Sequence, residues 1–129
     1  MPPIPGLRDA DPLTNETLFE NTVLPSHLLV IGAGPVGLEM AQAHRRLGAR
    51  VTVIEAATPL AHDDPELSAV ALAALGAEGV DILSGARVAR AFATPDGVGL
   101  ELDGGRILSG SHLLVAAGRR PNIGGLGLE

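Results

Sequence analysis

Short apolar runs punctuate this chain at intervals that suit a parallel β-sheet. Residues 28–31 and 113–116 are apolar without a single charge, which is typical of strands buried on both faces. The first run leads directly into a glycine-rich turn, and a second apolar run follows one helix-length later. We predict parallel strands over the ranges 27–31, 50–55, 80–83 and 113–116.

Helical spacing of apolar residues fills the gaps between the first three of these strands. The first helix is predicted over 35–48, where Gly48 ends it. The second begins at the acidic cluster 63–66, because carboxylates suit a helix N-terminus, and extends to Glu78. A short helix is also expected from Thr14, as N-cap, through Phe19.

The pattern changes between residues 87 and 109. Three short β-like stretches, at 87–92, 97–103 and 106–109, are separated by turn sequences that contain Asp-Gly. They predict a small antiparallel meander before the chain returns to the parallel sheet. The expected fold is therefore α/β, a Rossmann-like βαβαβ parallel sheet with a small antiparallel β-meander crossover.

The turn after the first strand carries the motif Gly32-x-Gly34-x-x-Gly37. Gly32 would let the strand turn into the helix, Gly34 would let a pyrophosphate approach the backbone, and Gly37 would let the helix pack closely. The free N–H groups of the first helical turn and the helix dipole favour a phosphate. We expect the whole loop to bind the dinucleotide, namely Gly32, Ala33, Gly34, Pro35, Val36 and Gly37.

Glu55 ends the second strand, about 20 residues after the motif, where such sites carry an acid. Its carboxylate would accept hydrogen bonds from the adenine-ribose hydroxyls and repel a 2′-phosphate, so it favours NAD(H) over NADP(H). The following segment, 56–61, offers no arginine for a 2′-phosphate. The alternative is a glycine turn that merely joins strand and helix, with Glu55 solvated.

Composition narrows the possible functions. The 129 residues suit one domain, and the net charge of −6 without a basic run argues against nucleic acid as a partner. No apolar stretch approaches the ~20 residues of a membrane span. Cysteine is absent, so disulfides and thiol catalysis are impossible, and the four histidines lack metal-ligand spacing. We expect a cytoplasmic location, no membrane partner and no metal site.

Three segments together resemble a known family. They are Pro3-Ile-Pro-Gly-Leu7, Gly32-Ala-Gly-Pro-Val-Gly-Leu-Glu39 and Val115-Ala-Ala-Gly-Arg-Arg-Pro-Asn122. In this order they resemble the NAD(P)H-binding domain of the class I FAD-dependent pyridine nucleotide–disulfide oxidoreductases, which include dihydrolipoamide dehydrogenase and mercuric reductase. The family's threonine in the third segment is Ala117 here.

The resemblance adds three residues to the expected cofactor site. It places Glu39 near the nicotinamide, Val88 near the adenine, and Gly118 where the chain passes close to the cofactor. Each has a plainer alternative: an exposed helix residue, a core strand valine and a strand-end turn. The resemblance assigns no catalytic residue to this chain.

The resemblance also implies what the chain does not contain. The family's redox-active cysteine pair, FAD-binding glycine motif and dimerisation domain have no counterpart here. We therefore expect residues 1–25 to be an interdomain linker with a short helix, 26–118 the dinucleotide-binding domain, and 119–129 a tail leading back toward an FAD domain. The parent, an expected homodimer, would pass hydride from NADH to FAD and then to a disulfide or similar acceptor, and the isolated chain would be inactive.

Two alternatives stay open. The chain could be a self-standing NAD-binding or regulatory module. Its parent could also be a mercuric reductase relative that uses NADPH.

Overall fold

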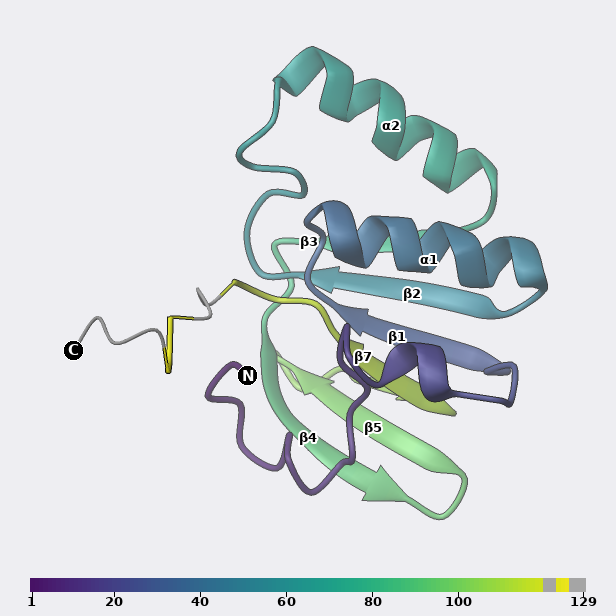
Figure 1. Ribbon diagram of the computed structural model, residues 1–129, viewed down its shortest axis with the longest axis vertical. Coiled ribbons are helices and arrows are strands. Elements are labelled where there is room, and N and C mark those ends of the chain that lie inside the picture. The colour runs from purple at the N-terminus through teal and green to yellow at the C-terminus, as the bar shows by residue number, and fades with distance from the viewer. Residues whose placement is uncertain (120–122, 126–129) are drawn as a thin grey trace.

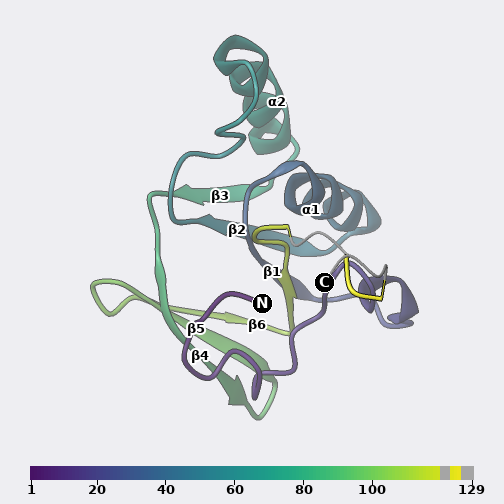
Figure 2. The same ribbon diagram turned by 60° about the vertical axis from the view of Figure 1, so that its left-hand side comes forward.

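The computed structural model describes residues 1–119 and 123–125. A four-stranded parallel sheet in the order β3-β2-β1-β7 forms its centre, and a three-stranded antiparallel sheet in the order β4-β5-β6 packs beside it. Figures 1 and 2 show the two α-helices on one side of the parallel sheet and the antiparallel strands on the other. The elements in chain order are η1 (Leu18–Glu20), β1 (His27–Ile31), α1 (Pro35–Leu47), β2 (Arg50–Glu55), α2 (Pro65–Ala77), β3 (Asp81–Ser84), β4 (Val88–Thr94), β5 (Gly97–Leu102), β6 (Ile107–Gly110) and β7 (His112–Val115).

This architecture confirms the predicted α/β fold class, the Rossmann-like parallel sheet and the meander crossover. The bounds of β1 and β2 match the predicted ones, and those of the other strands and of α1 and α2 differ by at most two residues. The expected helix over 14–19 is wrong in extent and type, because it is a turn followed by the 3-10 helix η1. The Thr14 hydroxyl nevertheless accepts hydrogen bonds from the N–H groups of Glu16 and Thr17, at 3.3 and 3.4 Å.

Alternation along the central strands explains their uninterrupted apolar sequences. In β1, Leu28 and Val30 face the helices, whereas Leu29 and Ile31 face the antiparallel sheet. Successive side chains of a strand point to opposite faces, so a strand covered on both sides needs apolar residues throughout. The two cores that result share β1, β2 and β7 as a common wall.

The N-terminal residues pack against this sandwich. Leu7 is buried in the core under the antiparallel sheet and Leu18 in the core under the helices. Leu13 forms a parallel bridge to Leu114, which partly covers the outer edge of β7. Residues 1–25 thus contribute to folding, and their role as a link to a further domain stays a prediction.

Helix α2 packs on the core through Leu72 and Leu75. Asp64 caps it by accepting hydrogen bonds from the N–H groups of Glu66 and Leu67. Neither helix in the described ranges is long and apolar enough to cross a membrane.

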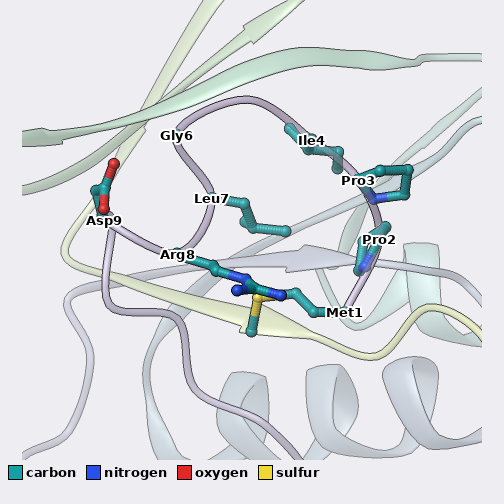
Figure 3. A pocket seen from close by; sticks show the side chains of 8 residues that line it. All are labelled: Met1, Pro2, Pro3, Ile4, Gly6, Leu7, Arg8 and Asp9. Carbon is teal, nitrogen blue, oxygen red and sulfur yellow. The ribbon is translucent and has the colours of Figure 1, made fainter.

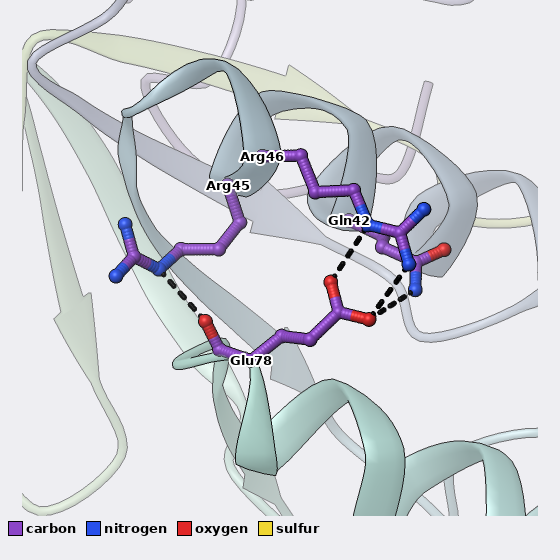
Figure 4. A network of polar contacts seen from close by, with 4 residues as sticks. All are labelled: Gln42, Arg45, Arg46 and Glu78. Carbon is purple, nitrogen blue, oxygen red and sulfur yellow. Dashed lines mark hydrogen bonds and ion pairs between the residues drawn. The ribbon is translucent and has the colours of Figure 1, made fainter.

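Beyond the C-terminal end of α2, Glu78 joins it to α1 through a network of polar contacts (Figure 4). Its carboxylate accepts two hydrogen bonds from Arg46, both at 2.8 Å, and one from Gln42, while its carbonyl accepts one from Arg45. These bonds lower the pKa of Glu78 to about 2, with the Arg46 hydrogen bonds as the main cause.

Candidate nucleotide-binding site

The turn between β1 and α1 can only be made by a glycine at position 32. Gly32 has φ of +108°, a conformation that residues with a side chain rarely adopt. A Cβ there would also lie 2.7 Å from the backbone oxygen of Ala116, which follows β7. Its N–H donates a 2.9 Å hydrogen bond to Ile54 at the end of β2. The tight turn expected of Gly32 is therefore present.

Gly37 brings α1 close to the end of β1. A Cβ at this position would lie 2.1 Å from the backbone oxygen of Gly32, well inside the contact distance of carbon and oxygen. The close helix packing expected of Gly37 is therefore also present. Without it, α1 would have to move away from the turn.

Gly34 lies in a different environment. It is the N-cap of α1, with φ of −80° and ψ of −179°, and a Cβ there would meet nothing within 4 Å. Lacking a side chain, it leaves the first turn of α1 without a side-chain cap. Pro35 follows at the first helical position. The loop thus presents uncapped N–H groups and open space at the positive end of a 13-residue helix, as a bound phosphate requires.

Glu55 is fastened directly to this loop. One oxygen of its carboxylate accepts a 2.9 Å hydrogen bond from the N–H of Ala33, and the other accepts one of the same length from Ala57. Each carboxylate oxygen can accept more than one bond, so capacity remains for a ligand hydroxyl. Sequence reasoning placed Glu55 beside the glycine loop but did not foresee its bond to Ala33.

A pocket of about 430 Å³ opens at the carboxyl ends of β1 and β2, where Gly32 and Glu55 meet. Its volume is in the range of small-molecule sites. The β3–β4 loop and the N-terminal segment supply its other walls. Its lining residues are Pro2, Pro3, Ile4, Pro5, Ile31, Gly32, Ile54, Glu55, Ala56, Ala86, Arg87, Val88, Ala89 and Ala117.

Sequence reasoning missed the proline segment and Arg87 as pocket residues. Prolines 2, 3 and 5 fall in the predicted linker, because proline favours an extended chain without a helix. Pro5 is anchored where its oxygen accepts the N–H of Ala91 in β4, at 2.9 Å. The position of Arg87 beside Val88, a residue already expected near the adenine, was the one signal available.

The three residues expected from the family resemblance lie in different places. Val88 is buried in the core under the antiparallel sheet and also lines the pocket. It is therefore a core strand valine that is also placed where an adenine could contact it. Glu39 is exposed on α1 and Gly118 is exposed after β7, with φ of +77°. Neither lines the pocket. Their contact with a cofactor stays a prediction.

A second hollow, of about 360 Å³, is lined only by the N-terminal segment (Figure 3). Its walls belong to residues 1–9, among which Leu7 points into the curl of the segment. It shares no residue with the glycine loop. Across the described ranges, no group of three or more His, Cys, Asp or Glu side chains is arranged to hold a metal ion.

Comparison with known proteins identifies the family. The model of a family described as pyridine nucleotide-disulphide oxidoreductase matches residues 1–129. The chain belongs to this family. The expected resemblance is thereby confirmed, and the third signature segment, of which residues 120–122 lie outside the described ranges, is included in the match.

Individual members of the pyridine nucleotide-disulphide oxidoreductase family are similar over nearly the full chain. A mercuric reductase of Streptomyces lividans is 39% identical over 131 residues, which cover 99% of this chain and 28% of that protein. Dihydrolipoyl dehydrogenase 3 of Pseudomonas putida is 38% identical, over 98% of this chain and 29% of that protein. The Cu(II) complex of the HOCl-induced flavoprotein disulfide reductase RclA from Escherichia coli superposes with a TM-score of 0.88 at 31% identity, over 95% of this chain and 29% of that chain. The chain thus spans less than a third of the length of these relatives.

Proposed function

We propose that this chain binds NADH as the pyridine-nucleotide domain of a flavin-dependent oxidoreductase. The observation that carries the proposal is the hydrogen bond from Ala33 to the Glu55 carboxylate. It holds an acid beside an uncapped helix N-terminus and at the edge of a pocket of suitable volume. The pyrophosphate would lie at Gly34 and the adenine ribose at Glu55, as in dinucleotide-binding folds.

Bound NADH would supply the hydride, and the chain would hold the NADH molecule in place. The first-turn N–H groups of α1 would hold the pyrophosphate, and the fixed carboxylate of Glu55 would select the ribose hydroxyls. A flavin held elsewhere in the parent would accept the hydride and pass the electrons to a disulfide or similar acceptor. We expect the 129-residue chain alone to bind NADH without oxidising it.

Isothermal titration of the chain with NADH and with ADP-ribose tests the binding step. Both ligands should bind, and Gly34→Val should abolish binding of both, because the new side chain would occupy the space of the pyrophosphate. A wild-type chain that binds neither ligand, or a Gly34→Val chain with unchanged affinity, would contradict the proposal.

The acceptor is the second open question, because two kinds of relative match almost equally well. The mercuric reductase is 39% identical and the dihydrolipoyl dehydrogenase 38% identical, so similarity over this domain favours neither a mercuric ion nor a lipoyl disulfide as the electron acceptor.

The open reading frame that surrounds this segment discriminates between a parent enzyme and a self-standing module. We expect it to encode an FAD-binding glycine motif, a cysteine pair and a dimerisation domain, which would make the FAD domain and a second copy of the parent the partners.

A further inference from the structure

The β3–β4 loop lies against the segment that follows Glu55. The N–H of Ala86 donates a 2.9 Å hydrogen bond to the backbone oxygen of Glu55, and the N–H of Gly85 donates one of 3.2 Å to Ala57. The parallel pairing of β2 with β3 holds these two strand ends side by side. Arg87, the next residue in the loop, therefore lines the same pocket as Glu55.

The backbone of Arg87 is fixed, but its side chain is not. Its carbonyl accepts a 2.9 Å hydrogen bond from the N–H of Asp103, and Val88 next to it pairs with Leu102 of β5. The Arg87 side chain is 74% exposed, and its Nε lies 3.8 Å from the Asp103 carboxylate, which is too long for a hydrogen bond. An exposed ion pair of this length contributes little, so the side chain can turn toward a ligand.

The position of this cation matters for the choice between the two nicotinamide cofactors. The segment 56–61 directly after Glu55 contains no arginine. Among the residues adjacent in sequence, a 2′-phosphate would therefore find only the repelling carboxylate of Glu55. The folded chain supplies a guanidinium from the neighbouring loop instead. Arginine binds phosphate through paired hydrogen bonds in a planar fork, which makes it the side chain best suited to this contact.

We propose that Arg87 is a specificity-determining residue that binds the 2′-phosphate of NADPH, so that this pocket admits NADPH as well as NADH. The inference rests on the proposed nucleotide-binding function. Glu55 still makes NADH the tighter ligand, and Arg87 reduces the difference between the two. Asp103 competes with the phosphate for the guanidinium.

Titrations with two pairs of ligands test this role: NADPH against NADH, and 2′,5′-ADP against 5′-AMP. Arg87→Gln should raise the Kd of NADPH and of 2′,5′-ADP about tenfold, the scale of one charge-assisted contact, and leave the ligands without a 2′-phosphate unchanged. Arg87→Lys should restore part of the loss. Asp103→Asn should tighten NADPH binding, because it removes the competing carboxylate.

Arg90→Gln is the matched control. It removes the same charge from β4 three residues further on, where Arg90 pairs with Glu101 away from the pocket lining. It should leave all four affinities unchanged. Thermal unfolding of each variant checks that the fold is retained.

The outcomes separate this inference from the proposed function. If Arg87→Gln weakens NADH and NADPH equally, or neither, while the wild-type chain binds NADH, Arg87 does not recognise the 2′-phosphate and the inference is overturned. If the wild-type chain binds no nucleotide at all, the proposed function fails and this inference fails with it.

Discussion

The N–H of Ala33 donates a 2.9 Å hydrogen bond to the carboxylate of Glu55, which joins the glycine loop to the end of β2. Ala33 is only 1% exposed, and in the folded chain its N–H has the Glu55 carboxylate as its hydrogen-bond acceptor. The acid therefore has a structural role besides the proposed contact with the ribose. Substitutions at Glu55 should affect folding and binding together.

Glu55→Ala should lower the free energy of unfolding by about 1–3 kcal/mol, because it leaves the buried N–H of Ala33 without an acceptor. It should also raise the Kd of NADH about 10- to 100-fold, the scale of hydrogen bonds to a charged group. Urea unfolding and calorimetric titration measure the two effects. Glu16→Ala, at an exposed acid in the N-terminal turn, is the control and should change neither the free energy of unfolding nor the Kd of NADH. An unchanged stability of Glu55→Ala would contradict the structural role of this carboxylate.

Substitution by alanine should affect the stability of the chain far more at Gly37 than at Gly34. Gly34→Ala places its Cβ in open space, so it should lower the free energy of unfolding by no more than about 1 kcal/mol, the scale on which alanine is a poorer N-cap than glycine, while it weakens NADH binding. Gly37→Ala places its Cβ 2.1 Å from the oxygen of Gly32 and should destabilise the chain by about 1–3 kcal/mol or more, as overpacking does. Thermal unfolding of the two variants, followed by titration of whichever stays folded, provides the measurement. Equal destabilisation by both would show that Gly34 is not open to a ligand.

The contribution of Glu78 to stability should depend on pH. Its pKa is lowered from 4.5 to about 2 in the folded chain, chiefly by hydrogen bonds from Arg46. A lowered carboxyl pKa gives a stabilisation that is complete above the unfolded-state value and is lost as the pH falls through the folded-state value. Wild type should therefore lose stability relative to Glu78→Gln between pH 4.5 and about 2.

Thermal unfolding of wild type and Glu78→Gln across that pH range measures this difference. Glu66→Gln, at the opposite end of α2, removes the same charge without touching Arg46 and serves as the control. A gap between wild type and Glu78→Gln that stays constant with pH would contradict the assignment.

His27 should titrate below its ordinary value. Burial at the start of β1 lowers the pKa of its imidazole, and the nearby charge of Arg50 lowers it further. Its Nε2 lies 2.9 Å from the hydroxyl of the buried Thr52. A lowered histidine pKa means that the folded chain prefers the neutral ring, so stability should fall as the pH drops below 6.5. An NMR titration that places the His27 midpoint at or above the ordinary value of 6.5 would contradict this.

Much of the fold could be predicted because the chain marks its own boundaries. Gly48 and Gly79, which end the two helices, both have positive φ, and Pro35 and Pro65 begin them. Strand β1 was recognisable because residues 28–31 are buried between the two layers and are all apolar. Thr14 shows the limit of local signals, since its hydroxyl accepts the expected N–H groups without starting a helix.

The candidate site was only half visible in the sequence. The glycine loop and Glu55 lie within one βαβ unit, whose geometry is known once the motif is recognised. The other wall depends on contacts between distant segments. Arg87 lies 32 positions after Glu55 and reaches it only through the pairing of β2 with β3, and Pro5 reaches β4 only through its bond to Ala91. The spacing of apolar residues along the chain carries no information about such contacts between distant segments.

The glycine loop separates what this domain needs to fold from what it needs to bind. Gly32 and Gly37 are required by backbone conformation and by close contact, whereas a side chain at Gly34 would meet no other atom of the chain within 4 Å. A related domain that no longer binds nucleotides could therefore replace the second glycine and keep its fold, provided that the first and third glycines remain. Among related sequences, a large side chain at that one position would identify domains that have kept the fold and lost the cofactor.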